Sequence, residues 1–446
     1  MINRRWFLKS CGMYGSVLLS SLPGFTASNI SQTTRRKPNI IIILADDLGY
    51  GDLSCYGNEE IHTPHLDALA EAGITFTDFH SSGAVCSPTR AGLMTGLYQQ
   101  RVNVGEVLTV ARHRERGLDT KYITFPKILQ NHGYKTAIYG KWHLGYKPEF
   151  NPVHHGFDDF RGYLSGNVDY ISHVDQAGVY DWWHNLESQP EEGYTTHLIT
   201  SHALNFIEEN QEHPFFLYLA HEAPHYPYQA PDDPADRFPD VDFPAHGSRK
   251  DVKNAYKTMI EELDKSVGSV VEKLRSLNLE KDTLILFFSD NGATPVGSNG
   301  NLRGHKGTIW EGGHRVPAFV CQPGVIAPGQ RCAVPVISLD LFPTILSAAD
   351  FEIPADVKPD GIDLMPLMTE NHSVQERTLF WEHGNQRAVR KGPWKLVASR
   401  EEGELKLELF NLDDDLSEQK DRASEKPELV ERLHSELKRW IQAVHS

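Results

Sequence analysis

Apolar runs that stop at polar residues recur along the first three hundred positions of the chain. Residues 39–45 (NIIIILA) form an unbroken apolar run, typical of a strand buried on both faces, and Asp46 and Asp47 follow it directly. Helical patterns, among them 65–72 and 252–277, separate such runs. Strands that alternate with helices predict an α/β fold with a large, mainly parallel sheet between helices, in which ligands bind beyond the carboxyl ends of the strands. The strands expected to end in polar residues are 39–45, 135–139, 215–220 and 283–289.

The pattern changes toward the end of the chain. From about Thr378 it consists of short segments in which apolar and polar residues alternate, which predicts a small antiparallel sheet. Pro427 then begins a helical pattern with one apolar face. We therefore predict a smaller C-terminal α+β domain. The predicted segments are a leader over 1–27, the main α/β domain over 28–370 and the C-terminal domain over 371–446.

Composition and charge exclude several classes of protein. The chain has 446 residues, of which 39% are hydrophobic and 23% charged, and no apolar run is long enough to span a membrane. These values exclude disordered, collagenous and polytopic membrane proteins, and we expect no stable membrane insertion. The net charge of −16 argues against non-specific binding to nucleic acid.

The first 27 residues have the features of an export signal. Residues 1–9 carry three basic residues and no acid, a weakly apolar stretch follows, and small residues lie at 26–28. Residues 4–9 (RRWFLK) resemble a twin-arginine signal, so we expect a bacterial protein exported to the periplasm or secreted. Cys11 precedes the apolar stretch, which argues against a lipid anchor. Cys321 and Cys332 fit either a disulfide or two buried thiols.

Cys86 stands at the start of a predicted helix. Pro88 suits the first turn of that helix and Ser87 suits its cap. Free N–H groups at a helix start favour an anion, and Arg90 adds a bidentate donor one turn later. By itself, this segment fits a reactive cysteine that faces an anionic substrate and also an inert, buried cysteine.

The segment Cys86-Ser87-Pro88-Thr89-Arg90, with Leu93 and Thr95-Gly96, resembles the signature of the type I sulfatases. Thr89 stands where many members have serine. The other motifs that match the family, in the same order, are Asp46-Asp47, 140–145 (GKWHLG), 289–292 (SDNG) and 302–307 (LRGHKG) with 311–313 (EGG). The resemblance covers essentially the whole mature chain. It implies an alkaline-phosphatase-like fold and a sulfuric ester hydrolase similar to arylsulfatase A, with Cys86 oxidised to formylglycine by a formylglycine-generating or an anaerobic sulfatase-maturating enzyme.

Four residues at two strand ends are candidate metal ligands. Asp46, Asp47, Asp290 and Asn291 offer only oxygen donors, which favour Ca²⁺ or Mg²⁺ over zinc. Adjacent acids at one strand end are often merely solvated, but the second polar pair favours a metal site. The resemblance implies a single Ca²⁺ held by these four residues and residue 86. Asn291, where a two-zinc phosphatase of the superfamily has histidine, argues against a zinc pair.

The resemblance also assigns the catalytic residues, and these are Cys86, Arg90, Lys141, His143, His221 and Lys306. A hydroxyl of the hydrated formylglycine would attack sulfur, while the cationic groups stabilise the sulfuryl oxygens. His221 or Lys306 would protonate the leaving oxygen, and His143 would act as the base that releases sulfate. The expected substrate contacts are Lys141, His221, Lys306, His225 and His305.

The substrate predicted for an exported sulfatase is a sulfated glycan. Residues 163–185 mix aromatic and polar side chains, which suits a sugar-binding surface and equally a loop that packs its own aromatics. A phosphodiester or phosphonate monoester hydrolase of the same superfamily is the alternative function. His221 and His225 match the H-E-x-x-H pattern of zinc proteases, but Pro224 would break the helix that such a site needs.

Overall fold

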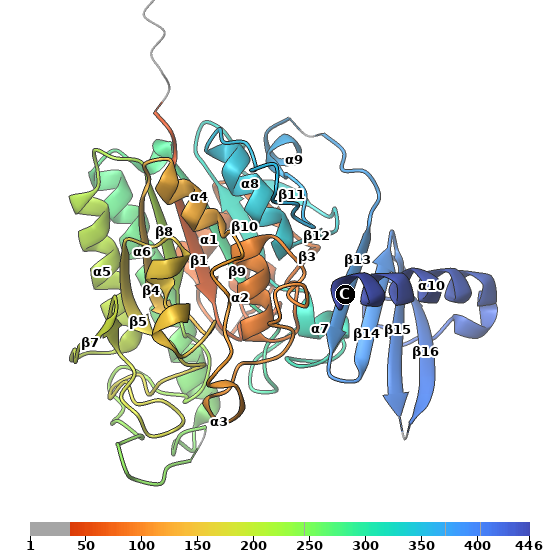
Figure 1. Cartoon of the computed structure of the whole chain (residues 1–446), viewed down its shortest axis with the longest axis horizontal. Coiled ribbons are helices and arrows are strands. Elements are labelled where there is room, and N and C mark those ends of the chain that lie inside the picture. Colours follow the sequence, from red (N-terminus) through yellow and green to blue (C-terminus); the bar gives the residue numbers. More distant parts are fainter. Residues whose placement is uncertain (1–35, 245, 371, 402) are drawn as a thin grey trace, which may run out of the picture. The chain divides into compact units, whose positions relative to one another are not determined.

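The computed structural model describes residues 36–244, 246–370, 372–401 and 403–446 (Figure 1). The predicted export signal lies outside them. Within these ranges the main sheet has ten strands, in the order β11-β2-β10-β9-β1-β8-β4-β5-β6-β7. Their bounds are β1 Asn39–Ala45, β2 Ile74–Phe76, β4 Lys135–Lys141, β5 Asp159–Tyr163, β6 Trp183–His184, β7 Glu187–Ser188, β8 Phe215–Ala220, β9 Thr283–Ser289, β10 Ala318–Cys321 and β11 Gln330–Cys332. A two-stranded sheet pairs β3 (Phe79–His80) with β12 (Val336–Ile337).

Helices cover both faces of the main sheet (Figure 1). The described α-helices are α1 Pro64–Glu71, α2 Cys86–Thr95, α3 Val110–His113, α4 Phe125–Asn131, α5 Thr195–Glu209, α6 Val252–Ser276, α7 Glu311–His314, α8 Leu341–Ala348, α9 Met365–Glu370 and α10 Pro427–Val444. Side chains alternate along β1: Ile40, Ile42 and Leu44 share a core with α2, α4 and α8. Ile41 and Ile43 pack into a second core with α1, α5 and α6. Each isoleucine removed from water in this way contributes about 1.5–3 kcal/mol, which explains why the run 39–45 is apolar without interruption.

Parallel strands form the centre of the main sheet. β1 pairs in parallel with β8 and β9, β4 pairs in parallel with β8 and β5, and antiparallel pairs flank this centre. The prediction of a mainly parallel, mixed sheet between helices is therefore confirmed. Because β9, β1, β8 and β4 are neighbours, their carboxyl ends meet at one edge, as the polar residues after them predict.

A second sheet and a long helix end the chain (Figure 1). The strands β13 (Thr378–His383), β14 (Gln386–Lys391), β15 (Trp394–Glu401) and β16 (Glu404–Asn411) form an antiparallel meander. The helix α10 covers this sheet with Leu433, Leu437 and Trp440, which are buried in its core. The predicted C-terminal sheet and helix are confirmed, and the boundary at residue 370 stays a prediction.

The described cysteines are all free thiols, so Cys321 and Cys332 form no disulfide in this structure. No helix within the described ranges is both long enough and apolar enough to cross a bilayer.

Candidate active site

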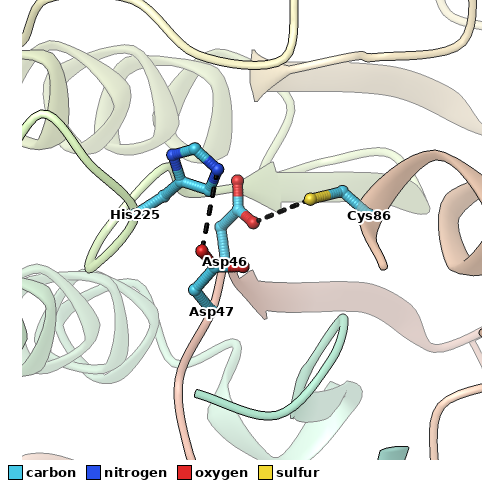
Figure 2. A group of neighbouring side chains, drawn as sticks. All are labelled: Asp46, Asp47, Cys86 and His225. Atoms are coloured by element: carbon cyan, nitrogen blue, oxygen red, sulfur yellow. Dashed lines mark hydrogen bonds and ion pairs between the residues drawn. The ribbon is translucent and has the colours of Figure 1, made fainter. Parts of the chain in front are cut away.

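Cys86 is the first residue of α2 and lies against the end of β1. Its neighbour Val85 has extended backbone dihedral angles, so the helix begins at the cysteine itself. The thiol donates to Asp46 Oδ1 over 3.4 Å (Figure 2). Cys86 also lines a cavity. Burial, followed by the negative charge of Asp46, raises the pKa of the Cys86 thiol to about 12. The thiol is therefore protonated at neutral pH and is a poor nucleophile as it stands.

Three buried carboxylates meet beside Cys86, as the two strand-end motifs predict. Asp46 and Asp47 follow β1, Asp290 follows β9, and each is at most 1% exposed. The backbone N–H of Asp47 donates to Asp290 Oδ1 over 3.3 Å. Burial and then the negative charge of Asp46 raise the pKa of Asp290 to about 7. Positive charge is thus needed here to keep the carboxylates ionised.

Asn291 and His225 complete the set of possible metal ligands. Asn291 Nδ2 donates to Asp47 Oδ1 over 2.8 Å, while its Oδ1 is buried without a partner among the described residues. The His225 ring approaches Asp47 from the side opposite Cys86, with Nε2 3.6 Å from Oδ2 (Figure 2). Ligand atoms of Asp46, Asp47, Cys86 and His225 lie within 4.8 Å of one another. Buried carboxylates and an orphaned amide oxygen are suitable ligands for Ca²⁺ or Mg²⁺.

Two lysines hold these carboxylates. The ammonium of Lys141, at the end of β4, contacts Asp46 Oδ2. Lys306 Nζ lies 2.6 Å from Asp47 Oδ1 and 2.8 Å from Oδ2. Burial alone would lower the pKa of Lys306, but Asp47 and the neighbouring negative groups outweigh it and hold this pKa well above its usual value. Both amines are therefore charged, and both are placed to bind an anion as well.

Arg90 has a different position from the one expected. It is 1% exposed and does not line the cavity; instead, Nε and Nη2 donate to Asp290 Oδ2 over 3.1 and 2.9 Å. A third donor, Nη1, reaches the carbonyl of Lys141 over 3.0 Å. The guanidinium therefore fixes Asp290 and the end of β4 relative to α2. In this geometry Arg90 holds parts of the site together and does not reach the cavity.

His143 faces the cavity with one free nitrogen. Its Nε2 lies 2.8 Å from the carbonyl oxygen of Leu108, an acceptor, so Nε2 carries the proton. Nδ1 is buried without a partner in the described structure. Burial and then the charge of Lys141 hold the pKa of His143 well below its usual value. The ring is therefore neutral and has a free lone pair, as a base requires, and His143 lines the same cavity as Cys86.

His221 lies outside this group of side chains, contrary to our expectation. Its Nε2 lies 3.4 Å from Ser266 Oγ on α6, and burial alone lowers the pKa of His221 to about 3. The reason is strand alternation: Leu217 and Leu219 face α5 and α6, and His221 continues their face of β8. His225, four residues later in a turn, is the histidine that reaches the carboxylates. Because residues 221–225 are not helical, the two rings form no zinc-protease motif.

The cavity beside Cys86 has a volume of about 400 Å³. Cys86, His143, His225 and Lys306 are among its lining residues, and the others are Val107, Leu108, Thr109, Val110, Ala111, Tyr146, Ser165, Gly166, Asn167, Gln176, Ala177 and Tyr226. His305 is exposed and does not line it.

The aromatic loop 163–185 mostly packs on itself. Tyr163 stacks on Trp182, which in turn stacks on His173, and these three side chains are at most 1% exposed. Of this loop, Ser165, Gly166, Asn167, Gln176 and Ala177 reach the cavity.

Sequence reasoning missed the support of the Lys306 loop by the C-terminal sheet. Lys395 of β15 is fully buried, with Nζ 2.9 Å from Glu311 Oε1 and 2.8 Å from Glu418 Oε1. Glu418 Oε2 also accepts from the backbone N–H of Glu311 at the start of α7, over 2.6 Å. In the sequence, Lys395 is only a charged residue within a segment of alternating apolar and polar positions, and such a pattern predicts an exposed side chain. Arg315 belongs to the same support, because it pairs with Glu311 and Asp78.

Comparison with known proteins agrees with this arrangement. The model of the Sulfatase family matches residues 38–351, and a model described as N-sulphoglucosamine sulphohydrolase, C-terminal, matches residues 304–443. N-acetylgalactosamine-6-sulfatase of Rattus norvegicus is 34% identical over 386 residues, which cover 80% of this chain and 71% of the relative. Arylsulfatase A of Homo sapiens is 34% identical over 380 residues, which cover 78% and 70%.

A solved structure is similar over nearly the whole chain. The crystal structure of Ps i-CgsB in complex with k-i-k-neocarrahexaose has a TM-score of 0.82 and 32% identity, over 91% of this chain and 93% of the other. The fold and the site thus define a sulfuric ester hydrolase with an alkaline-phosphatase-like sheet. The chain belongs to the Sulfatase family.

Proposed function

We propose that this sulfatase removes sulfate from a sulfated carbohydrate, with formylglycine formed from Cys86 and with a bound Ca²⁺. The observation that carries the proposal is the setting of Cys86. Its thiol starts α2 and faces the cavity, beside Asp46 and the free Nδ1 of His143, yet the raised pKa of the thiol leaves it unreactive. Conversion of this residue explains why a site built around an inert thiol has a base and three cations around it.

The residues suited to hold Ca²⁺ are Asp46, Asp47, Asp290 and Asn291, with residue 86. His225 is an additional candidate, because its ring nitrogen lies within 4.8 Å of ligand atoms of Asp46, Asp47 and Cys86. The test of fit is the unpartnered Oδ1 of Asn291 together with the three buried carboxylates. When bound, the ion supplies positive charge for the sulfuryl oxygens and lowers the pKa of the hydroxyl nucleophile. Hydrated formylglycine would supply that hydroxyl and also a second hydroxyl, whose deprotonation would let the bond from carbon to the sulfated oxygen break, so that sulfate leaves and the aldehyde re-forms.

The side chains of this chain bind the sulfate group and move the protons. With their carboxylate partners neutralised, Lys141 and Lys306 can bind the negative oxygens of the sulfate group. Arg90 orients Asp290 and favours its ionised form. Lys306 lines the cavity, is charged, and is the proton donor placed to serve the leaving sugar oxygen, while His225 lines the cavity beside it. His143 Nδ1 then accepts the proton whose removal releases sulfate.

Two kinds of similar protein support the proposal that the substrate is a sulfated carbohydrate. One solved neighbour, 32% identical, holds a neocarrahexaose, and the curated relatives include N-acetylgalactosamine-6-sulfatases. The cavity also suits a sugar ring, because neutral polar and apolar side chains make up most of its lining beside Cys86, His143, His225 and Lys306. We further propose that the leader directs export to the bacterial periplasm and that a formylglycine-generating or anaerobic sulfatase-maturating enzyme acts on Cys86.

The test is mass spectrometry of the peptide that contains residue 86, from protein made in its native host. The same preparation is assayed for sulfate released from 4-nitrophenyl sulfate and from sulfated sugars, with 4-nitrophenyl phosphate as the competing ester. We expect an aldehyde or its hydrate at position 86 and preference for sulfate esters. An unmodified thiol in an active preparation would refute the nucleophile, and preference for the phosphate ester would favour a phosphoester hydrolase.

A further inference from the structure

The short helix α3 forms part of the rim of the active-site cavity. Val110 and Ala111, at its start, line the cavity together with Val107, Leu108 and Thr109. Arg114 follows the helix with helical dihedral angles, φ −56° and ψ −30°. Because residues three and four positions apart share a face of a helix, Arg114 lies on the face of Ala111 and Val110. An arginine therefore stands next to the cavity, one turn beyond its lining.

Arg112 and Arg114 add positive charge at this rim. Both are exposed, and neither side chain makes a hydrogen bond or a close ion pair with a described residue, although Arg112 is near enough to Glu106 to help lower the pKa of that carboxyl. Nearby acids already have closer partners: Glu106 Oε1 lies 2.7 Å from Arg116 Nη1 and 3.5 Å from His113 Nε2. Glu115 pairs with Lys147. In a chain with a net charge of −16, such a patch beside the active site is suited to an anion.

The cavity itself has a different charge character. Its lining residues include one lysine, Lys306, which belongs to the sulfate end, and no carboxylate or arginine. The remaining walls are apolar or neutral, with Tyr146, Asn167, Gln176 and Tyr226 among them. A second anion on the reacting sugar would find no partner there, because an unpaired charge is costly in a part-buried pocket.

We propose that Arg112 and Arg114 bind an anionic group on a sugar next to the one that is desulfated. This inference rests on the proposed function, since it concerns the same substrate. The sugar in the cavity carries the reacting sulfate and is otherwise neutral, and its neighbour in the chain carries a sulfate ester or a carboxylate at the rim. The substrate is then an anionic oligosaccharide or polysaccharide rather than a free sulfated monosaccharide.

The test measures binding without turnover. The full mature chain carries Cys86→Ser, and two probes are titrated by calorimetry: a multiply sulfated carrageenan hexasaccharide and N-acetylgalactosamine 6-sulfate, which has one anion. Arg114→Gln, Arg114→Glu and the Arg112→Gln/Arg114→Gln pair are compared with Arg432→Gln, which removes an exposed arginine of α10. Each titration is repeated at about 50 and about 300 mM NaCl, because salt screens exposed charges.

We expect the double variant to bind the hexasaccharide about tenfold more weakly at low salt, as the loss of two exposed ion pairs implies. Arg114→Glu should weaken it further, high salt should reduce the difference, and the monosaccharide should bind all variants equally. Equal affinity of all variants for the hexasaccharide, equal losses for both probes, or no binding of the hexasaccharide to the reference protein would overturn the inference. Failure of the proposed function is a separate result, namely no sulfate release from 4-nitrophenyl sulfate by matured protein that still has Cys86 in its sequence.

Discussion

Two histidines that lie close together in the sequence point their rings to different places in this structure. His221 and His225 follow the same strand, but the His221 ring faces Ser266 on α6 while the His225 ring faces Asp47. Only the second ring lines the cavity. The direction follows from the alternation of side chains in β8 and from the turn after it. A motif places both histidines near the site, and only the structure shows which ring enters it.

This difference predicts unequal effects of matched substitutions. His225→Gln should lower kcat/KM for an aryl sulfate about 10²–10⁴-fold, because it removes a proton-transfer group or ligand at the reacting end. His221→Gln should retain most of the activity, because glutamine can keep a hydrogen bond with Ser266. Steady-state kinetics of both variants, with thermal unfolding as a check on folding, measures this. Equal losses, or the larger loss in His221→Gln, would contradict the geometry.

His143 permits a prediction about the order of steps. Its free Nδ1 is positioned to act as the release base, so His143→Ala should still allow sulfuryl transfer but slow the release of sulfate. A sulfated form of residue 86 should then accumulate, and intact-peptide mass spectrometry after a brief reaction detects it. The control is Tyr146→Phe, which keeps the ring and removes only a second hydrogen bond to the Leu108 carbonyl. An active His143→Ala enzyme without the adduct would argue for another base.

At the scale of elements, the active site depends on the C-terminal sheet. Lys395 of β15 and Glu418 hold Glu311, where α7 begins, and the loop before α7 carries Lys306. The Lys306 N–H donates to the Ala293 carbonyl and that of Gly307 to the Ala84 carbonyl, so the loop is fixed on both sides. One ammonium serves two buried carboxylates here. Burial raises the pKa of both carboxyls and the charge of Lys395 lowers it, but the balance differs. The pKa of Glu311 lies well below its usual value, whereas burial dominates at Glu418 and raises its pKa to about 7.

The raised pKa of Glu418 predicts a pH-dependent stability. The folded pKa of Glu418 is about 7 and exceeds the ordinary value of 4.5, so the folded state binds this proton more tightly than the unfolded chain does. The resulting contribution to folding stability is complete below pH 4.5 and is lost as the pH rises through about 7. Relative to Glu418→Gln, the wild-type protein should therefore lose on the order of 2–3 kcal/mol of unfolding free energy between about pH 5 and 8. Urea unfolding of both proteins at several pH values measures this difference. A constant difference across the range would show that Glu418 ionises normally.

At the scale of the whole molecule, the sequence predicts the strands of the sheet well, but it does not predict which side chains pair with one another. Unbroken apolar runs identify buried parallel strands, and their polar ends identify the edge where the site forms. The pairs that decide each role join residues far apart in the chain: Arg90 with Asp290, and Lys395 with Glu311. Local patterns contain no information on such pairs. For the same reason, the strand ends indicate that Cys86 and the carboxylates lie close together, whereas no local pattern indicates that Arg90 pairs with Asp290.

The same convergence predicts that Ca²⁺ stabilises the whole fold. Its proposed ligands come from the ends of β1 and β9 and the start of α2, and the unfolded chain cannot bring these together. Binding to the folded state alone adds RT ln(1 + [L]/Kd), about 4 kcal/mol at a thousandfold excess over Kd. The melting temperature of the wild-type protein should therefore rise by several degrees with Ca²⁺, and a chelator should reverse the rise.

Matched variants distinguish this site from general ion effects. Asn291→Ala removes the unpartnered amide oxygen and should abolish most of the Ca²⁺-dependent rise in melting temperature. Asp264→Asn changes a buried carboxylate on α6 that accepts from the backbone N–H groups of His65 and Leu66, so it should lower the melting temperature but keep the full Ca²⁺ effect. A Ca²⁺ effect that is equal in both variants would mean that the ion binds elsewhere, because only Asn291 belongs to the proposed ligand set.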